Sequence, residues 1–159
     1  MNGVRSKLLE RSYAGADLQT RAGLTNDYED FALFVARRLF EDFGIKGEIK
    51  ITSARGSCYQ PLADKAHRVS FGRRSVMRAA DLGFTEYKTI ASTWAGRLDP
   101  DDSYMQVWAL AIHEFAHVLH TIRGFRVHGH CHDTAFAHIL RELQVAYAYS
   151  DFLYREGLG

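Results

Sequence analysis

The sequence predicts an α+β fold in a single domain, with an N-terminal helix, a small antiparallel sheet, a central helix and a C-terminal helix. Its 159 residues, 47% of them hydrophobic, are enough to build one domain with a sizeable core. Three segments carry apolar residues at helical spacing, and two short alternating segments lie between the first and the second of them. We find no internal repeat and no domain boundary.

The first helix is expected to follow a loosely ordered arm, residues 1–25, which lacks clear periodicity and contains three glycines. The domain then covers residues 26–159. Asn26 or Asp27 can cap the helix, and acidic residues follow in its first turn. Apolar residues then recur at every fourth position and predict one buried stripe that ends before Gly44: Phe31, Val35, Leu39 and Phe43.

The sheet is predicted from two short segments, residues 48–52 and 67–71, in which apolar and polar residues alternate. Such alternation is typical of half-buried strands. Because the two segments are close in sequence, we expect them to pair in an antiparallel sheet that has room for a third strand. A turn-rich stretch through Gly56 and Pro61 lies between them. Residues 75–80 fit either a helical turn or that third strand.

The central helix is predicted by its start signal, Asp99-Pro100-Asp101-Asp102-Ser103, which combines capping residues, a proline and acids. We expect it to reach about Ile122, just before Gly124. It is apolar on nearly all sides, which predicts a buried, central position. A last helix is expected from about Asp133, with one apolar stripe made of Phe136, Leu140, Leu143 and Tyr147.

A metal site is predicted within the central helix by His113-Glu114-Phe115-Ala116-His117, an HExxH motif. Histidines four residues apart project from one face of a helix, one turn above the other. The two imidazoles can therefore bind one Zn²⁺ ion, with Glu114 at its rim as a base for the attacking water. A metal would also supply partners for ring nitrogens that are otherwise buried. The motif predicts a zinc-dependent protease.

A third protein ligand has to complete such a site, because a catalytic zinc ion has three protein ligands and one open position. The sequence leaves four candidates open after the motif: His128, His130, His132 and Glu142. His120 lies one further turn along the face of His113 and His117, where it can hydrogen-bond a carboxylate or carbonyl near the site.

The HExxH motif, followed after a gap by His132-Asp133-Thr134-Ala135-Phe136, resembles the SprT-like metalloprotease family, which includes the eukaryotic spartan protease acting on DNA–protein crosslinks. The resemblance implies a zincin-like domain, with His113, His117 and His132 as zinc ligands and Glu114 as the base. It also implies hydrolysis of peptide bonds, with DNA-associated proteins as one class of substrate.

This resemblance covers roughly residues 26–150, although its specific motifs are only the two just quoted. Asp133 stands where the family has a glycine, and we expect Asp133 to cap the last helix instead.

A cluster of basic residues lies in residues 51–80, which contain six cationic side chains and only one acidic side chain, that of Asp64. A patch of this kind can bind nucleic-acid phosphate or an acidic protein. The six candidate nucleic-acid-binding residues are Arg55, Lys65, Arg68, Arg73, Arg74 and Arg78. A solvated sheet edge is the other interpretation, because basic side chains there discourage strand addition.

An alternative function follows from these two features together. The protein would then be a catalytically inactive, zinc-stabilised module that contacts nucleic acid or protein through residues 51–80. A fourth protein ligand would mark such a closed site, and His128, His130 and Cys131 are the candidates.

The overall composition favours a cytoplasmic or other intracellular protein, and the HExxH motif predicts that its substrate is a protein or peptide. Two cysteines are too few for a disulfide framework, and the net charge of +1 indicates no particular partner. The polar first twenty residues do not resemble a secretory signal, and the apolar runs are too short to cross a membrane.

Overall fold

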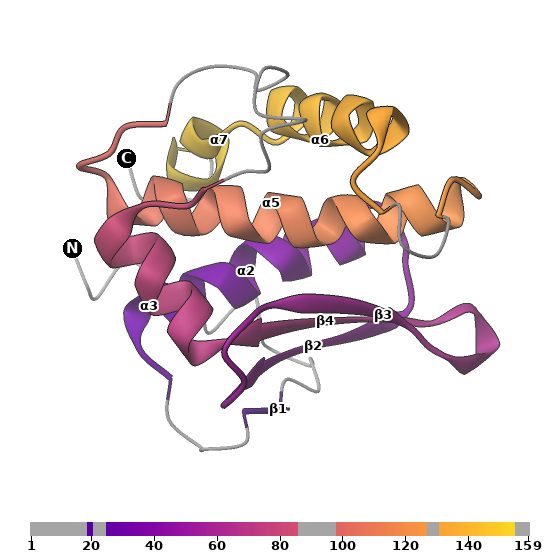
Figure 1. The fold of residues 1–159 in the computed structure, drawn as a ribbon, viewed down its shortest axis with the longest axis horizontal. Coiled ribbons are helices and arrows are strands. Elements are labelled where there is room, and N and C mark those ends of the chain that lie inside the picture. The colour runs from indigo at the N-terminus through magenta and orange to yellow at the C-terminus, as the bar shows by residue number, and fades with distance from the viewer. Residues whose placement is uncertain (1–18, 21–24, 86–97, 127–130, 155–159) are drawn as a thin grey trace.

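The computed structural model of the protein describes residues 19–20, 25–85, 98–126 and 131–154. Its architecture is α+β, as predicted. The long helix α5 (Ser103–Ile122) crosses the middle of the molecule, with helices α6 (Thr134–Ala146) and α7 (Tyr149–Tyr154) on one side and the sheet on the other (Figure 1). Within these residues no helix is both long and apolar enough to cross a lipid bilayer.

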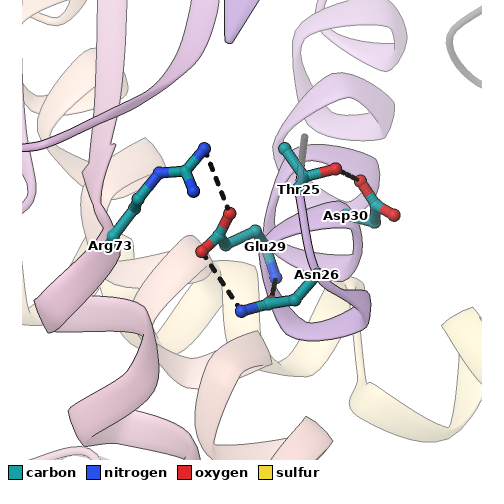
Figure 2. Close-up of polar contacts among 5 residues, drawn as sticks. All are labelled: Thr25, Asn26, Glu29, Asp30 and Arg73. Carbon is teal, nitrogen blue, oxygen red and sulfur yellow. Dashed lines mark hydrogen bonds and ion pairs between the residues drawn. The ribbon is translucent and has the colours of Figure 1, made fainter. Parts of the chain in front are cut away.

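Helix α2 (Asp27–Asp42) begins after the predicted cap, Asn26. The Asn26 Oδ1 atom accepts a hydrogen bond from the Glu29 amide at 2.8 Å, and the Asn26 amide group donates to Glu29 Oε2 at 3.2 Å (Figure 2). This reciprocal contact satisfies polar groups of the first turn, as a capping box does. The buried Glu29 carboxylate also lies 3.8 Å from the Arg73 guanidinium of helix α3 (Arg73–Leu82), which links the two helices.

The sheet has four strands in the order β1-β2-β4-β3. The predicted antiparallel pairing of residues 48–52 with residues 67–71 is wrong, because β2 (Gly47–Thr52) and β4 (His67–Gly72) run parallel. Strand β3 (Cys58–Pro61) pairs antiparallel with β4, and the short strand β1 (Gln19–Thr20) pairs parallel with β2.

The parallel pairing follows from strand β3, which lies in the segment predicted to be turns. The chain reverses once between β2 and β3 and a second time between β3 and β4, so β4 returns to the direction of β2. Strand β4 is then inserted between the other two, and β3 becomes the edge of the sheet next to α5. Residues 75–80 belong to helix α3 and form no strand.

The helix predictions are confirmed at their starts. The Asp102 carboxylate caps α5 by accepting from the Met105 amide at 3.1 Å, and most of α5 is buried. The predicted last helix is divided, because α6 ends at Ala146 and α7 follows as a separate short helix. The arm, apart from β1, and most of residues 85–94, which look weakly helical in sequence, lie outside the described residues.

Candidate metal centre

His113 and His117 project from one face of α5, as their spacing predicts. Their ring centres are 5.0 Å apart. His113 is buried, and His117 is partly exposed. The helix therefore holds two imidazoles side by side without any contribution from the rest of the fold.

His132 joins this pair from the segment that precedes α6. Its ring centre lies 5.2 Å from that of His113 and 4.8 Å from that of His117. One ring nitrogen from each of the three histidines lies within 4.8 Å of the other two. The three side chains form a group that is able to hold one metal ion.

The separation of two of these nitrogens fits a metal ion closely. His132 Nε2 lies 3.3 Å from His113 Nε2. Two nitrogens bound to one tetrahedral zinc ion, each at about 2.0–2.1 Å, are separated by about 3.3 Å. Imidazole nitrogens and a borderline-soft metal ion are also well matched in chemistry, so the donor set suits zinc.

The surroundings keep the third imidazole, His117, neutral. Burial lowers the pKa of His117 to about 2, and His113 and His132 contribute to the same shift through their nearby charges. A metal ligand has to present an unprotonated ring nitrogen. The environment of His117 thus favours the protonation state that binds a metal, at every pH at which the protein is expected to be folded.

Phe136, in the first turn of α6, packs against all three histidines. Its ring centre lies 5.1 Å from that of His113, 4.5 Å from that of His117 and 5.1 Å from that of His132. The Phe136 side chain is fully buried. It provides the apolar support that fixes the three rings relative to one another.

A second polar contact joins α5 to the start of α6. The fully buried His120 ring lies 2.9 Å through Nε2 from Asp133 Oδ1, and the same oxygen accepts from the Phe136 amide at 2.9 Å. Burial acts to raise the pKa of Asp133, but the hydrogen bonds from Phe136 and His120 lower it overall. Asp133 therefore caps α6, as predicted, and also ties His132, its neighbour, to α5.

Glu114 lies in the same pocket as the three histidines. The pocket has a volume of about 200 Å³ and opens between β3, the C-terminal half of α5 and the segment before α6. The Glu114 side chain is only 6% exposed. The described residues that line the pocket are Ser57, Cys58, Tyr59, His113, Glu114, His117, Arg126, Cys131 and His132.

Of the other candidate ligands, Glu142 is placed away from this group. Its carboxylate is exposed and lies 3.0 Å from the guanidinium of Arg123. Cys131 lines the pocket, 3.6 Å through Sγ from His132 Nδ1, but is not a member of the metal-ligating group. His128 and His130 lie outside the described residues.

The six basic residues of the predicted nucleic-acid patch do not form one surface. Lys65, in the turn before β4, lies at one end of that strand, whereas Arg55 and the three arginines of α3 lie near the other end. Arg68 pairs with Glu48 and lies 3.3 Å from Gln60, and Arg73 pairs with Glu29. None of the six lines the pocket described above. Their role in binding nucleic acid stays a prediction.

Tyr59 and Arg126 are among the pocket residues that the sequence did not indicate as part of this site. The Tyr59 ring is nearly parallel to that of His117, at 6° and 6.4 Å between centres, and Tyr59 Oη lies 2.7 Å from His67 Nδ1. The alternation around Tyr59 is hidden because the strand is short and turn residues flank it. Arg126 follows α5 in a segment without a recognisable pattern.

No protein-family model, curated protein or solved structure matches this chain. The resemblance to the SprT-like family therefore depends on the two short motifs alone. The function has to be argued from the geometry and chemistry of the site.

Proposed function

We propose that the protein is a zinc-dependent metalloprotease of the SprT-like type, an endopeptidase that hydrolyses peptide bonds. The observation that carries this proposal is the presence of Glu114 in one pocket with three histidines that can hold a metal ion. A site that binds metal only for stability does not need an adjacent carboxylate. Among the residues that the structure describes, the metal-ligating group has three members, which suits a catalytic site with an open position.

The role of each residue in the site follows from the chemistry of its side chain. His113, His117 and His132 would hold the Zn²⁺ ion, which supplies Lewis acidity for activating water and polarising a carbonyl. Glu114 accepts the proton of the attacking water and donates it to the leaving amine. The position of Glu114 supports this role, because its side chain is only 6% exposed and lines the same pocket as the three histidines.

A peptide substrate would bind along the edge of the sheet. Strand β3 has β4 on one side and is the last strand in the order of the described sheet. The first two residues of β3, Cys58 and Tyr59, and the preceding Ser57 also line the pocket. An extended peptide that adds to this edge as a further strand would carry its scissile bond past Glu114.

DNA-associated proteins are the proposed class of substrate, on the strength of the family resemblance. The arginines of α3 and Arg55, at one end of the sheet, supply cationic side chains for contact with DNA phosphate. Binding that weakens steeply with increasing salt would support this contact, and binding that is insensitive to salt would contradict it.

The central test separates metal binding from turnover. We expect the wild-type protein to bind one zinc ion per chain, measured by elemental analysis, and to cleave an unfolded protein substrate. Glu114→Gln should keep the zinc ion and lose at least about 10²–10⁴-fold in turnover, because the proton acceptor is removed. His138, on the exposed face of α6, provides a control, and His138→Gln should change neither quantity.

Two outcomes would contradict the proposal. Retained turnover in Glu114→Gln would remove Glu114 from the reaction. Zinc binding with no hydrolysis by the wild-type protein under any condition, including added DNA, would favour the inactive zinc-stabilised module.

A further inference from the structure

Arg126 contributes a positive charge to the metal pocket that zinc binding and water activation do not need. It follows the last turn of α5 and lines the pocket together with Glu114 and the three histidines. A cation next to the site of a divalent cation is electrostatically unfavourable unless an anion lies near both. The one carboxylate among the described pocket residues is Glu114, which the proposed reaction uses as its base.

The guanidinium of Arg126 is held over an anchored aromatic ring. Arg126 Cζ lies 5.1 Å from the centre of the Tyr59 ring, a cation–π arrangement. Tyr59 is itself fixed, because it is only 8% exposed and its hydroxyl lies 2.7 Å from His67 Nδ1. The planar group is therefore supported on one face, and the Arg126 side chain also hydrogen-bonds that of Tyr59, which leaves its other N–H donors for a substrate group.

Neighbouring Arg123 differs from Arg126 in how its positive charge is paired. Its guanidinium lies 3.0 Å from the Glu142 carboxylate, so its charge is matched within the chain. Among the described residues no carboxylate forms an ion pair with Arg126. Arg123 is also outside the pocket, whereas Arg126 belongs to its wall.

The position of Arg126 also limits how far its partner can be from the metal centre. The Tyr59 ring centre is 6.4 Å from that of His117 and 5.1 Å from Arg126 Cζ, so the guanidinium is no farther from His117 than these two distances together. An extended peptide advances about 3.3 Å per residue. A group bound by Arg126 would thus lie within a few residues of the peptide bond at the metal.

We propose that Arg126, supported by Tyr59, binds a carboxylate of the substrate within a few residues of the scissile bond. This inference depends on the proposed protease function and adds its substrate class, a peptide that carries a carboxylate near the cleavage point. The carboxylate belongs either to the C-terminus of the peptide or to an Asp or Glu side chain, and both present the same planar pair of oxygens to the guanidinium.

Binding measurements test the inference without hydrolysis. The zinc-loaded Glu114→Gln protein is titrated calorimetrically with acetylated hexa-alanine that ends in a free carboxylate or in an amide. A second series of amidated peptides carries one Glu, or the isosteric Gln, at each position in turn. We expect a preference of about tenfold or more for the carboxylate peptide of at least one pair, since hydrogen bonds to charged groups are the strong ones. A preference for the free C-terminus over the amide would identify the C-terminal carboxylate as the bound group, and a preference for Glu over Gln would identify a side-chain carboxylate.

Variants then assign the preference to Arg126. In the Glu114→Gln background, Arg126→Gln should abolish it and Arg126→Lys should keep only part of it, because lysine lacks the bidentate fork. Arg123→Gln, which removes an equal charge three residues away, should leave it intact. A carboxylate preference that persists in Arg126→Gln would mean that the metal alone binds the carboxylate, and it would overturn the proposal, as would equal binding of every pair.

Kinetics of the Glu114-intact protein distinguish the remaining possibility. We expect Arg126→Gln to raise KM for the carboxylate peptides by a larger factor than for the amide peptides. An equal loss of kcat for all peptides would place Arg126 at the reacting atoms and overturn its role in recognition. If the binding preference depends on Arg126 but nothing is hydrolysed, the protease function fails and this inference stands. If peptides are hydrolysed but carboxylate and amide peptides bind equally well, the protease function stands and this inference fails.

Discussion

His113 Nε2 and His132 Nε2 lie 3.3 Å apart although they are separated by 19 residues and come from different elements. The separation is that expected of two ligands of one tetrahedral zinc ion. The fold therefore brings His132 to ligand distance from His113, in a group whose three ligand atoms all lie within 4.8 Å of one another.

Zinc is expected to stabilise the fold, because it would bind the assembled histidines much more tightly than the unfolded chain. At a free zinc concentration of 1,000 times Kd, the gain is about 4 kcal/mol. Removal of zinc by a chelator should thus lower Tm in thermal unfolding followed by circular dichroism. His132→Gln should show no such difference between zinc and chelator, and an equal difference in that variant would mean that the metal binds elsewhere.

Asp133→Ala should weaken both the fold and the metal site. The substitution removes the cap of α6 and the contact with His120, which we expect to cost about 1–3 kcal/mol of unfolding free energy. Because His132 is the next residue, zinc affinity should fall by about tenfold, as for other groups that orient ligands.

Asp102→Ala provides a matched control for this variant. Asp102 caps α5 and also accepts a hydrogen bond from the Tyr149 hydroxyl at 3.0 Å, so it makes two similar contacts away from the metal site. Denaturant unfolding should show a comparable loss of stability, whereas a zinc titration should show unchanged affinity. A loss of zinc affinity as large as that of Asp133→Ala would mean that the effect is general destabilisation.

Phe136→Leu should lower both the stability of the protein and its affinity for zinc. The effect on zinc is expected because Phe136 contacts all three histidine rings. We expect the free energy of unfolding to fall by about 1–3 kcal/mol, because leucine fills the buried site of the phenylalanine ring imperfectly. Phe152→Leu removes an aromatic ring that is buried to the same degree and packs against Phe34. It should destabilise the protein similarly without affecting zinc, as measured by competition with a chromogenic chelator.

His67 is expected to make the protein less stable in mild acid. Burial lowers the pKa of His67 below its ordinary value of 6.5. At pH 7.5 neither the folded nor the unfolded state carries the proton. As the pH falls through 6.5, the unfolded chain binds a proton that the folded protein does not, so the free energy of unfolding decreases by at most about 1.4 kcal/mol per pH unit.

Urea unfolding at pH 7.5 and 5.5 tests this pH dependence by comparing the wild type with His67→Gln in the same metal state. The wild type should lose more stability than the variant between the two values, because the contributions of the other histidines are common to both. Equal losses would show that His67 titrates alike in the folded and unfolded states.

The sequence predicted the helices more accurately than the sheet, for physical reasons that particular residues illustrate. Asn26, Asp102 and Asp133 each cap a helix. These caps could be predicted from the sequence because a capping side chain binds amides only two or three residues away. The direction of β4 depends on β3, whose four residues lie between turn residues and carry little periodicity of their own. A strand missed at that point reverses the direction inferred for the next one.

The candidate site shows the same division between local and long-range information. The juxtaposition of His113 and His117 follows from helix geometry alone. The resemblance already favoured His132 over Glu142, and the fold agrees, because Glu142 lies on an exposed face of α6 beside Arg123. Tyr59 and Arg126 meet only in the folded chain, so no sequence spacing could have indicated that pair.

The insertion of β4 between β2 and β3 has a consequence for the order of folding. The β3–β4 hairpin closes a short loop, whereas the parallel register that pairs Ile49 with Val69 joins residues much farther apart in the chain. Short loops cost less entropy to close, so we expect the hairpin to form first and to dock on β2 as a unit. Pulsed hydrogen exchange during refolding should then protect hairpin amides before those that join β2 to β4. Cys58 and Tyr59, which line the pocket, belong to this hairpin, so one wall of the pocket would form early in folding.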